Sequence, residues 1–298
     1  MLQRAHPPII VHARHGTVGH REAPHRTYAG PGPVGARRGQ AAVEALIGTA
    51  DSARASPQPS ASRDPAAMRC HLAALPAGPR QYGVAMTESP PPGGTVLGAD
   101  ELETRWADAW RPEQVAERLV GVSVPWCVAA GWALDLFRGR QSRPHGDLEI
   151  AVPSAGFAQV RDCFPEYVFD AVGSGRIWPG AGAETLAATH QTWLRDPANG
   201  RFLLDVFREP HDNGTWICRR DRSLRLPYDA VVERTADGIP YLVPELVLLF
   251  KAKSPRPKDH TDFAGVLPLL DRVRQDVLAG WLDRRHPGHP WLAELTRR

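Results

Sequence analysis

Lysine is nearly absent from this sequence, and large aromatic residues are missing from its first part. The 298 residues contain 3 lysines, 33 arginines and 4 cysteines. Residues 1–85 contain no Trp and no Phe. A segment without large apolar side chains cannot offset the entropy that it loses on ordering, so we expect the first 85 residues to be disordered.

Three interpretations of residues 1–85 stay open: a disordered tail, a translation start placed upstream of the true one, and a targeting peptide. Met86 offers a natural beginning, because a Pro/Gly-rich linker and the first predicted helix follow it. The apolar run PPIIVHA is too short for the core of a signal peptide. The histidines between His6 and His25 stand at irregular spacing among prolines, which does not favour a metal site.

The sequence also lacks long apolar runs and closely spaced cysteines. The sequence has no run of 18 uninterrupted apolar residues, so we expect neither a membrane span nor a membrane partner. Its cysteines lie far apart without C-x-x-C spacing, which indicates reduced thiols and a cytoplasmic location. Beyond residue 85, 26 Lys and Arg face 29 Asp and Glu, so the remaining chain is near neutral and a nucleic-acid partner is not expected.

The periodicity of apolar residues predicts an α+β fold, in which a mixed sheet is flanked by helices. We divide the chain into a leader and linker over 1–99, a core over 100–243 and a small helical part over 244–298. Helices are expected at 100–121, with Pro112 opening a second segment, at 132–140, at 154–163 and from Pro244 onward, and extended runs at 125–131, 147–153, 167–172, 189–195, 201–209 and 214–220.

The stretch RPHGDLEIAV, residues 143–152, reads as a strand with two acids on one face. Asp147 and Glu149 share that face, and Leu148 and Ile150 share the other. Side chains two apart on a strand are about 6.6 Å apart, so two ionised carboxylates repel by about 2.5 kcal/mol at an effective dielectric of 20. Divalent cations would turn this repulsion into attraction. The solvated face of an edge strand is the alternative.

A third acid stands alone in the apolar run FLLDVF, residues 202–207. A buried unpaired carboxylate costs several kcal/mol, so Asp205 should have a cation as its partner. Asp205 would be a third ligand if it pointed at the site of Asp147 and Glu149. Pairing with Arg201 or Arg208 is the alternative.

The lysines form a single cluster in KAKSPRPK. A compact point charge suits a triphosphate, and Lys251 ends an apolar helical run that can aim its ammonium group inward. We expect Lys258 to be solvated and Lys253 to point to another face of the helix. Chance clustering at a solvated helix end is the alternative.

These motifs together resemble a known superfamily. The run AAGWALDLFRGRQSRPHGDLEIAV, the lone strand aspartate and the run LLFKAKSPRPKDHTDF are similar to nucleotidyltransferases, most of all to the aminoglycoside 2''-O-nucleotidyltransferase (adenylyltransferase) type. The resemblance covers roughly residues 100–295. It implies a polymerase-β-like core in which Asp147 and Glu149 bind Mg²⁺ and Asp205 is the third carboxylate.

The same resemblance implies a phosphate site beside these acids. Gly131 and its turn would hold the nucleotide phosphates, and Arg143 and His145 would flank them. Two departures from the family pattern stand out, because Ala130 occupies the first of two positions that are usually both glycine, and Glu149 replaces the commoner Asp. The first would tighten the phosphate turn, and the second lengthens one ligand arm.

Four further residues of these motifs are expected to be structural. Trp132 should pack its helix, and Asp135 should cap a helix or pair with an Arg. Asp259 and Asp262 are expected to cap the following helix.

The sequence thus predicts a Mg²⁺-dependent nucleotidyltransferase that moves AMP from ATP to a hydroxyl of a small acceptor. Two Mg²⁺ ions would orient the α-phosphorus, and Asp205 would act as general base. The acceptor is aminoglycoside-like by resemblance, which implies a role in antibiotic resistance. One alternative is a toxin-like enzyme that modifies tRNA or protein through a basic groove at 219–225. The other is a non-catalytic nucleotide-binding module, which would be expected to have lost one of the three acids.

Overall fold

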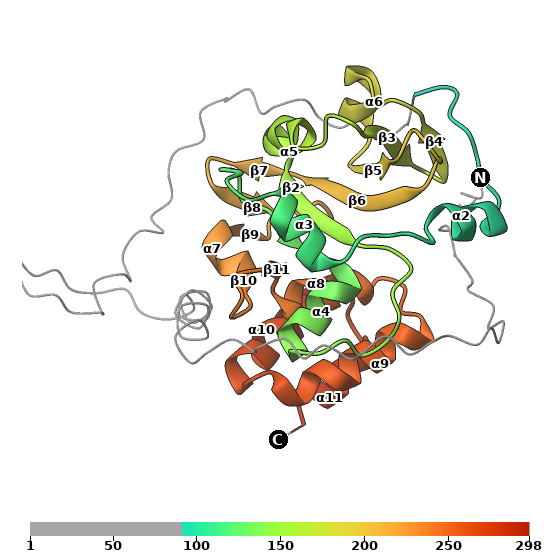
Figure 1. Cartoon of the computed structure of the whole chain (residues 1–298). Helices are drawn as coiled ribbons and strands as arrows, with labels where there is room; N and C mark the ends of the chain where they lie inside the picture. The colour runs from blue at the N-terminus through green and yellow to red at the C-terminus, as the bar shows by residue number, and fades with distance from the viewer. Residues whose placement is uncertain (1–90, 298) are drawn as a thin grey trace, which may run out of the picture.

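The computed structural model describes residues 91–297, and these form a mixed sheet with helices on both of its sides (Figure 1). The main sheet has eight strands in the order β10-β11-β1-β2-β6-β5-β3-β4, and a second sheet has the order β7-β8-β9. The predicted α+β class is therefore confirmed. The expectations for residues 1–85 and for Met86 lie outside the described residues.

The strands are short except in the middle of the main sheet. They are β1 (Cys127–Val128), β2 (Glu149–Pro153), β3 (Val168–Gly173), β4 (Arg176–Trp178), β5 (Gln191–Arg195), β6 (Phe202–Glu209), β7 (His211–Asp212), β8 (Thr215–Ile217), β9 (Arg225–Pro227), β10 (Val232–Arg234) and β11 (Pro240–Leu242).

Helices precede the first strand, stand between some of the strands and follow the last strand at the C-terminal end. They are α2 (Ala99–Arg105), α3 (Pro112–Arg118), α4 (Ala130–Arg138), η2 (Ser154–Gly156), α5 (Phe157–Asp162), α6 (Ala183–Ala188), α7 (Tyr228–Val231), α8 (Pro244–Lys251), α9 (Pro257–Val266), η3 (Leu267–Leu269), α10 (Arg272–Arg285) and α11 (Trp291–Leu295).

The centre of the sheet brings together strands that are far apart in the sequence. β2 pairs with β6 in parallel, and β1 pairs with β2 in antiparallel orientation. Ile150 and Val152 of β2 and Leu204 and Val206 of β6 are each at most 1% exposed. These apolar side chains form the core on one face of the sheet, which leaves the other face of the same strands for polar residues.

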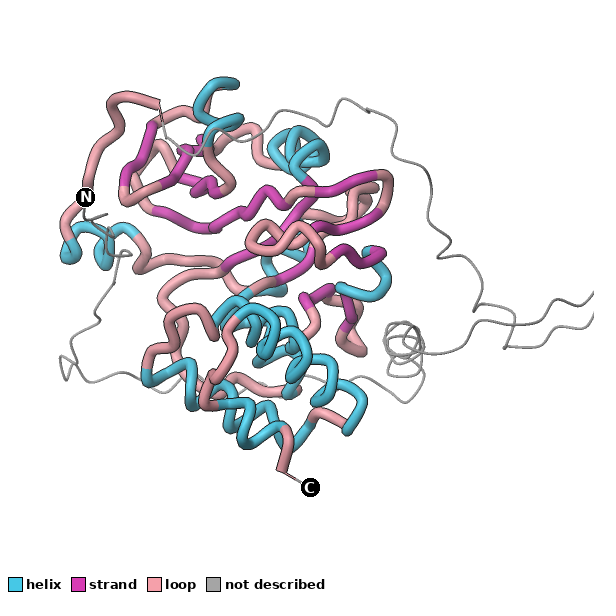
Figure 2. Tube along the Cα trace, turned by 180° about the vertical axis from the view of Figure 1, so that it is seen from behind, coloured by secondary structure: helices cyan, strands magenta, loops and turns pink. Residues whose placement is uncertain are grey.

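The helices form two layers. In Figures 1 and 2, α5 and α6 lie on one side of the main sheet, and α8 to α11 gather with α4 on the other. The C-terminal helices pack through aromatic side chains, because the rings of Phe263 and Trp291 stack with centroids 4.4 Å apart. In the part of the chain that is described, no helix is long and apolar enough to cross a membrane.

The chain packs on the sheet earlier than the predicted boundary at residue 100. Thr95 and Ile177 exchange backbone hydrogen bonds of 2.8 and 2.9 Å, and Ile177 belongs to β4, a strand that lies between the predicted extended runs 167–172 and 189–195 and was not predicted. Gly94 permits this approach, because a Cβ atom there would lie 2.7 Å from the Trp178 ring. β4 is short and glycines flank it, so the periodicity of apolar residues did not predict this strand.

Candidate active site

The three acids predicted as metal ligands lie where β2 begins, beside the middle of β6. Asp147 lies two residues before Glu149, the first residue of β2, and Glu149 pairs in register with Asp205 on β6. The Asp205 amide donates to the Leu148 carbonyl oxygen at 2.9 Å. Register partners on adjacent strands are about 4.8 Å apart and project to the same face. Leu148 and Ile150 are fully buried on the opposite face, as the alternation predicts.

Asp205 is buried, and no cationic side chain of residues 91–297 forms an ion pair with it. Only 3% of the residue is exposed. Its Oδ2 accepts from Gln191 Nε2 at 2.5 Å, whereas its Oδ1 has no hydrogen-bond partner among the described residues. Arg201 pairs with Asp108, and Arg208 donates to backbone carbonyl oxygens, so the alternative pairing of Asp205 with either arginine is wrong.

Burial and mutual repulsion raise the pKa values of Glu149 and Asp205. Burial, and then the charges of Asp147 and Asp205, raise the pKa of Glu149 well above its usual value. Burial raises the pKa of Asp205 well above its usual value, Asp147 adds to this, and the Gln191 hydrogen bond opposes it. Within 91–297, no three His, Cys, Asp or Glu side chains are gathered closely enough to form a metal-binding group. Repulsion separates unneutralised carboxylates, so a cation would have to draw them together.

Gly131 lies at the start of α4 with two side chains packed directly on its Cα atom. A Cβ atom at Gly131 would lie 2.7 Å from Arg143 Nη2 and 2.7 Å from two atoms of the His145 ring. No side chain larger than hydrogen fits there without displacing one of them. The structure therefore brings together the three residues that the resemblance assigns to the phosphate site.

Ala130 precedes Gly131 with a backbone φ of 48°. This left-handed conformation costs a residue with a Cβ atom about 1–2 kcal/mol and costs glycine almost nothing. The departure from tandem glycines thus places strain in the turn that leads into α4.

We expect the Ala130→Gly variant to be more stable than the parent by about 0.5 kcal/mol, because relief of the strain exceeds the entropy that glycine adds to the unfolded chain. Urea denaturation measures the difference. Ala133→Gly is the control within the same helix, where glycine should destabilise by about 1 kcal/mol or more. A loss of stability in Ala130→Gly would contradict the strained turn.

His145 is fixed in one tautomer by its neighbours. Its Nε2 lies 2.7 Å from Asp135 Oδ2, and its Nδ1 lies 3.1 Å from Arg143 Nη1. Arginine can only donate, so Nδ1 accepts and Nε2 carries the proton that is donated to Asp135. Burial lowers the pKa of His145. The hydrogen bond to Asp135 opposes this effect and the charge of Arg143 adds to it, so the ring is neutral at pH 7. Trp132 stacks on the ring with centroids 4.5 Å apart.

Asp135 therefore has neither of its expected roles. It is 1% exposed, and it accepts from His145 and, at 2.5 Å, from the Ser142 hydroxyl. It lies in the interior of α4, so it does not cap the helix, and it pairs with a histidine instead of an arginine. Trp132 packs as expected and also donates from Nε1 to the Asp147 carbonyl oxygen at 3.1 Å.

A buried ion-pair network joins this loop to the C-terminal helices. Arg143 donates from Nε and Nη2 to the two oxygens of Asp262 at 3.2 and 3.1 Å. Lys251 Nζ lies 2.7 Å from Asp259 Oδ1 and 3.0 Å from Asp262 Oδ2. Asp259 also accepts from the Arg256 backbone amide at 2.9 Å, which is the expected cap. Asp262 does not cap the helix, because it lies beyond the first turn of α9 and holds Arg143 and Lys251.

Lys253 and Lys258 are both exposed, whereas Lys251 is largely buried. Lys258 makes no ion pair with any of residues 91–297, and its charge acts on Glu149. Partial desolvation, followed by the charges of Arg256 and Arg143, lowers the pKa of this exposed lysine, and Asp147 opposes this. Lys258 is thus exposed, as expected, although its charge also acts on the acids. Lys251, by contrast, has its ammonium group held between two aspartates.

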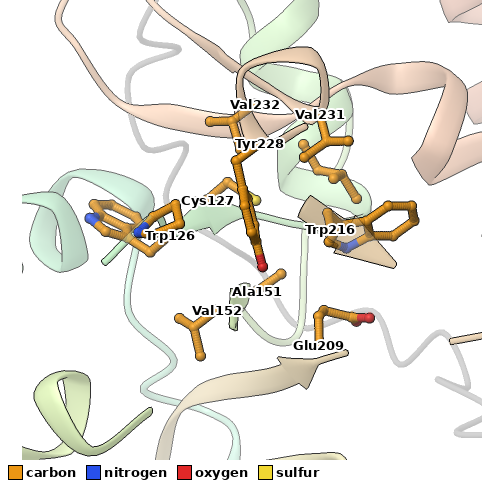
Figure 3. Close-up of a pocket in the computed structure, with 11 residues that line it drawn as sticks. Trp126, Cys127, Ala151, Val152, Glu209, Trp216, Tyr228, Val231 and Val232 are labelled. Atoms are coloured by element: carbon orange, nitrogen blue, oxygen red, sulfur yellow. The ribbon is translucent and has the colours of Figure 1, made fainter. Parts of the chain in front are cut away.

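A small cavity lies at the C-terminal ends of β2 and β6, away from the three acids. Figure 3 shows the Tyr228 hydroxyl group pointing into it, with Glu209 and Trp216 beside it. Its free volume is about 10 Å³, room for about one water molecule. The cavity is too small for a nucleotide or an acceptor, so the acids remain the candidate site.

Gln191 and Lys258 were not predicted as residues of this site. Gln191 pairs with Phe207 on β6. Because side chains alternate along a strand, the side chain of Gln191 lies on the same face of the sheet as that of Asp205. Lys258 is the second residue of α9, near the N-terminal end of that helix. The alternation of strands 191–195 and 202–209 could have indicated Gln191, but the position of α9 relative to the sheet depends on tertiary packing.

Comparison with known proteins supports the predicted resemblance over part of the chain. Residues 113–177 match the family model described as aminoglycoside-2''-adenylyltransferase. The matched range contains Gly131, Arg143, His145, Asp147 and Glu149 and ends before Asp205. The chain is thus similar to aminoglycoside adenylyltransferase-like nucleotidyltransferases, which confirms the resemblance that the motifs predict.

Several solved structures show a distant similarity, whereas the comparison with curated proteins finds no match. The lincomycin-bound lincosamide antibiotic adenylyltransferase LnuA is 16% identical with a TM-score of 0.40, over 55% of this chain and 99% of that chain. ANT(2'')-Ia in complex with adenylyl-2''-tobramycin is 11% identical with a TM-score of 0.39, over 58% of this chain and 95% of that chain. A nucleotidyltransferase-like protein from Paracoccidioides brasiliensis is 16% identical with a TM-score of 0.26, over 67% and 94%.

Proposed function

We propose that this protein is a nucleotidyltransferase that moves a nucleoside monophosphate, AMP from ATP, onto a hydroxyl group of a small acceptor. The observation that carries the proposal is that Glu149, at the start of β2, pairs in register with Asp205 of β6 just after Asp147, and that one buried Asp205 oxygen has no hydrogen-bond partner among the described residues. An unpaired buried carboxylate oxygen is costly unless a ligand satisfies it. The resemblance suggests an aminoglycoside-like acceptor and a cytoplasmic enzyme.

The donor set suits magnesium, because all three side chains offer carboxylate oxygens. Asp147, Glu149 and Asp205 would hold two Mg²⁺ ions, whose chemistry is to neutralise the phosphates and activate the attacking oxygen. Asp205 would accept the proton of the acceptor hydroxyl as that oxygen attacks the α-phosphorus and pyrophosphate leaves.

The β1 side of the acids would bind the phosphates. Gly131 leaves room for a close approach of the α4 N-terminal turn, and Arg143 and His145 lie directly against it. Asp262 and Asp135 hold these two side chains in place, so little conformational entropy would be lost on binding.

Transfer is tested by incubating the full chain with each nucleoside triphosphate labelled in its α-phosphate, with Mg²⁺ and hydroxylated compounds. We expect label to appear on an acceptor with ATP as the best donor, together with equimolar pyrophosphate. Calorimetric titration of Mg²⁺-ATP gives an independent readout. Absence of both nucleotide binding and label transfer would overturn the proposed function.

The contacts of the three lysines change our expectation about which one meets the triphosphate. Lys258→Ala should weaken Mg²⁺-ATP binding about tenfold, or about 1.4 kcal/mol, because its exposed ammonium group forms no ion pair with the described residues and its charge acts on Glu149. Lys251→Ala should mainly destabilise the fold, by about 3 kcal/mol, because it removes a cation from two buried aspartates. Calorimetry and urea denaturation separate the two effects.

Lys253 is the matched control, since it is exposed in the same segment. Lys253→Ala should change neither nucleotide affinity nor stability. Equal nucleotide affinities for the Lys258 and Lys253 variants would contradict a phosphate contact by Lys258, and an unchanged stability of Lys251→Ala would contradict the structural role of its ion pairs.

A further inference from the structure

A second unsatisfied polar atom lies on the strand next to Asp205. Trp193 on β5 pairs in register with Asp205 on β6, so the two side chains project to the same face of the sheet. Trp193 Nε1 and Asp205 Oδ1 are both buried, and neither has a hydrogen-bond partner within residues 91–297. The two residues are only 9% and 3% exposed. One buried donor and one buried acceptor are therefore left open on neighbouring strands.

The open donor faces the open acceptor without forming a hydrogen bond to it. Burial raises the pKa of Asp205, the Gln191 hydrogen bond opposes this, Asp147 adds to it, and the Trp193 N–H group again opposes it. The indole therefore acts on the carboxylate, although the contact does not have the geometry of a full hydrogen bond. Gln191 occupies the other oxygen, Oδ2, at 2.5 Å, which leaves Oδ1 free for a ligand.

The packing of Trp193 holds its N–H group in place. The ring centroid lies 4.9 Å from that of Phe202 and 5.3 Å from that of Trp106, and both contacts are edge-on. A ring that packs against two others cannot turn toward a different partner without breaking these contacts. A buried indole N–H group usually has a hydrogen-bond partner, so one that is held open beside a carboxylate points to a ligand.

A substrate group can reach these two atoms from one side. Glu149, Gln191 and Phe207 surround Asp205 on the adjacent strands and are only half-buried. Phe202, which packs against the other side of the Trp193 ring, is fully buried. The approach to Asp205 Oδ1 and Trp193 Nε1 is therefore from the side of Gln191 and Phe207.

We infer that Trp193 and Asp205 together bind the acceptor hydroxyl group, and that Trp193 thereby selects oxygen over a protonated amine as the group that is modified. This inference rests on the proposed function. A hydroxyl group both donates and accepts, so it satisfies Asp205 Oδ1 and Trp193 Nε1 at the same time. A carboxylate oxygen has two lone pairs, so Oδ1 can accept this hydrogen bond and also bind a cation.

An aminoglycoside-like acceptor also carries ammonium groups, which would compete for the Asp205 carboxylate. An ammonium group donates hydrogen bonds but has no lone pair. In this position it would leave the Trp193 N–H group buried and unsatisfied, which disfavours it by about tenfold or more. The neutral indole donor thus favours a hydroxyl group where charge alone would favour an amine.

The same two contacts orient the hydroxyl oxygen for attack. Its hydrogen points to Asp205 and one lone pair to Trp193, which leaves the second lone pair for the α-phosphorus. The new O–P bond forms as the bond from phosphorus to pyrophosphate breaks, and the hydroxyl proton passes to Asp205. Trp193 neither gives nor takes a proton, and its contribution is to position the nucleophile.

The indole N–H signals in NMR spectra of the full chain, labelled with ¹⁵N in its tryptophan side chains, test the contact. Trp193→Phe and Trp106→Phe each identify one signal by its loss. With Mg²⁺ and a non-hydrolysable ATP analogue present, tobramycin and ethanol should each shift the Trp193 signal downfield, as a new hydrogen bond does. Ethylammonium, which matches ethanol in size but cannot accept, should not shift it. The Trp106 signal should stay in place with all three probes.

Transfer kinetics give a second readout. Trp193→Phe should lower kcat/KM for tobramycin about tenfold and leave Mg²⁺-ATP affinity unchanged. Trp106→Phe is the matched control, because it removes an indole from the same cluster of rings and should keep the parental kcat/KM. If Trp193→Phe does not fold, 3-benzothienylalanine at position 193 keeps the size of the ring, has sulfur in place of N–H and should give the same loss.

A Trp193 signal that moves with neither tobramycin nor ethanol, or that moves equally with ethylammonium, would overturn the inference. Parental kcat/KM without the N–H group at position 193 would overturn it as well. Calorimetric titration of Mg²⁺-ATP into the parent separates this from the proposed function. If Mg²⁺-ATP binds in those cases, the proposed function survives; if it does not bind, the proposed function fails too.

Discussion

Asp147→Asn and Glu149→Gln should each reduce nucleotidyl transfer at least about a thousandfold, which corresponds to about 4 kcal/mol of transition-state stabilisation. Each change removes one of the two carboxylate charges at the start of β2 and keeps the size of the side chain. The rate of label transfer at saturating Mg²⁺ measures the effect. Glu166→Gln is the control, because Glu166 is an exposed acid beyond the site and should keep parental activity.

The same variants should be at least as stable as the parent when metal is absent. Burial and two neighbouring anions raise the pKa of Glu149, so the folded state holds the proton more tightly than the unfolded chain does. Ionised Glu149 therefore destabilises the metal-free protein above its raised pKa, and this cost vanishes below the unfolded value of about 4.3. The stability advantage of Glu149→Gln should grow as the pH rises through that window.

Thermal unfolding with and without Mg²⁺ provides a readout that does not depend on activity. Mg²⁺ should raise the melting temperature of the parent, because a ligand that binds only the folded state stabilises it, and should raise that of either variant much less. Parental transfer rates in either variant, or equal shifts with Mg²⁺ in all three proteins, would contradict the proposed metal site.

Much of the sheet around this site follows from local sequence pattern. Alternation over 147–153 predicted which side chains of β2 are buried, and Leu148 and Ile150 are fully buried. The lone acid in 202–207 predicted a buried Asp205 that needs a partner. Both inferences rest on the period of two and on the cost of burying charge, and these hold for a strand wherever it lies in a fold.

The contacts across the site depend on packing between distant segments, which no local pattern specifies. Arg143 and Asp262 are 119 positions apart and form two hydrogen bonds. Their contact depends on how α9 sits against α4, and this is fixed by buried apolar side chains. The lysine cluster shows the consequence, because composition indicated a special role for the lysines but could not indicate that Lys251 would be held by Asp259 and Asp262.

Gly131→Ala should lower kcat/KM for the nucleotide about a hundredfold, because the added methyl group must displace Arg143 or His145. The Cβ atom would lie 2.7 Å from Arg143 Nη2 and from the His145 ring, well inside van der Waals contact. Neither side chain can move freely, since Asp262 holds Arg143 through two hydrogen bonds and Asp135 holds His145 at 2.7 Å. A misplacement of about 1 Å in a positioned site can cost a hundredfold in rate.

Gly146→Ala is the matched control for this change. Gly146 lies in the same loop, next to Asp147, and a Cβ atom there would meet nothing within 4 Å. Both variants lose a glycine, so they share any effect on the unfolded chain, and only Gly131→Ala places a methyl group against Arg143 and His145. The weakened step should appear in Mg²⁺-ATP affinity measured by calorimetry. Equal nucleotide affinities for the two variants would mean that the α4 turn does not approach the phosphates and that Gly131 serves only the packing of the loop.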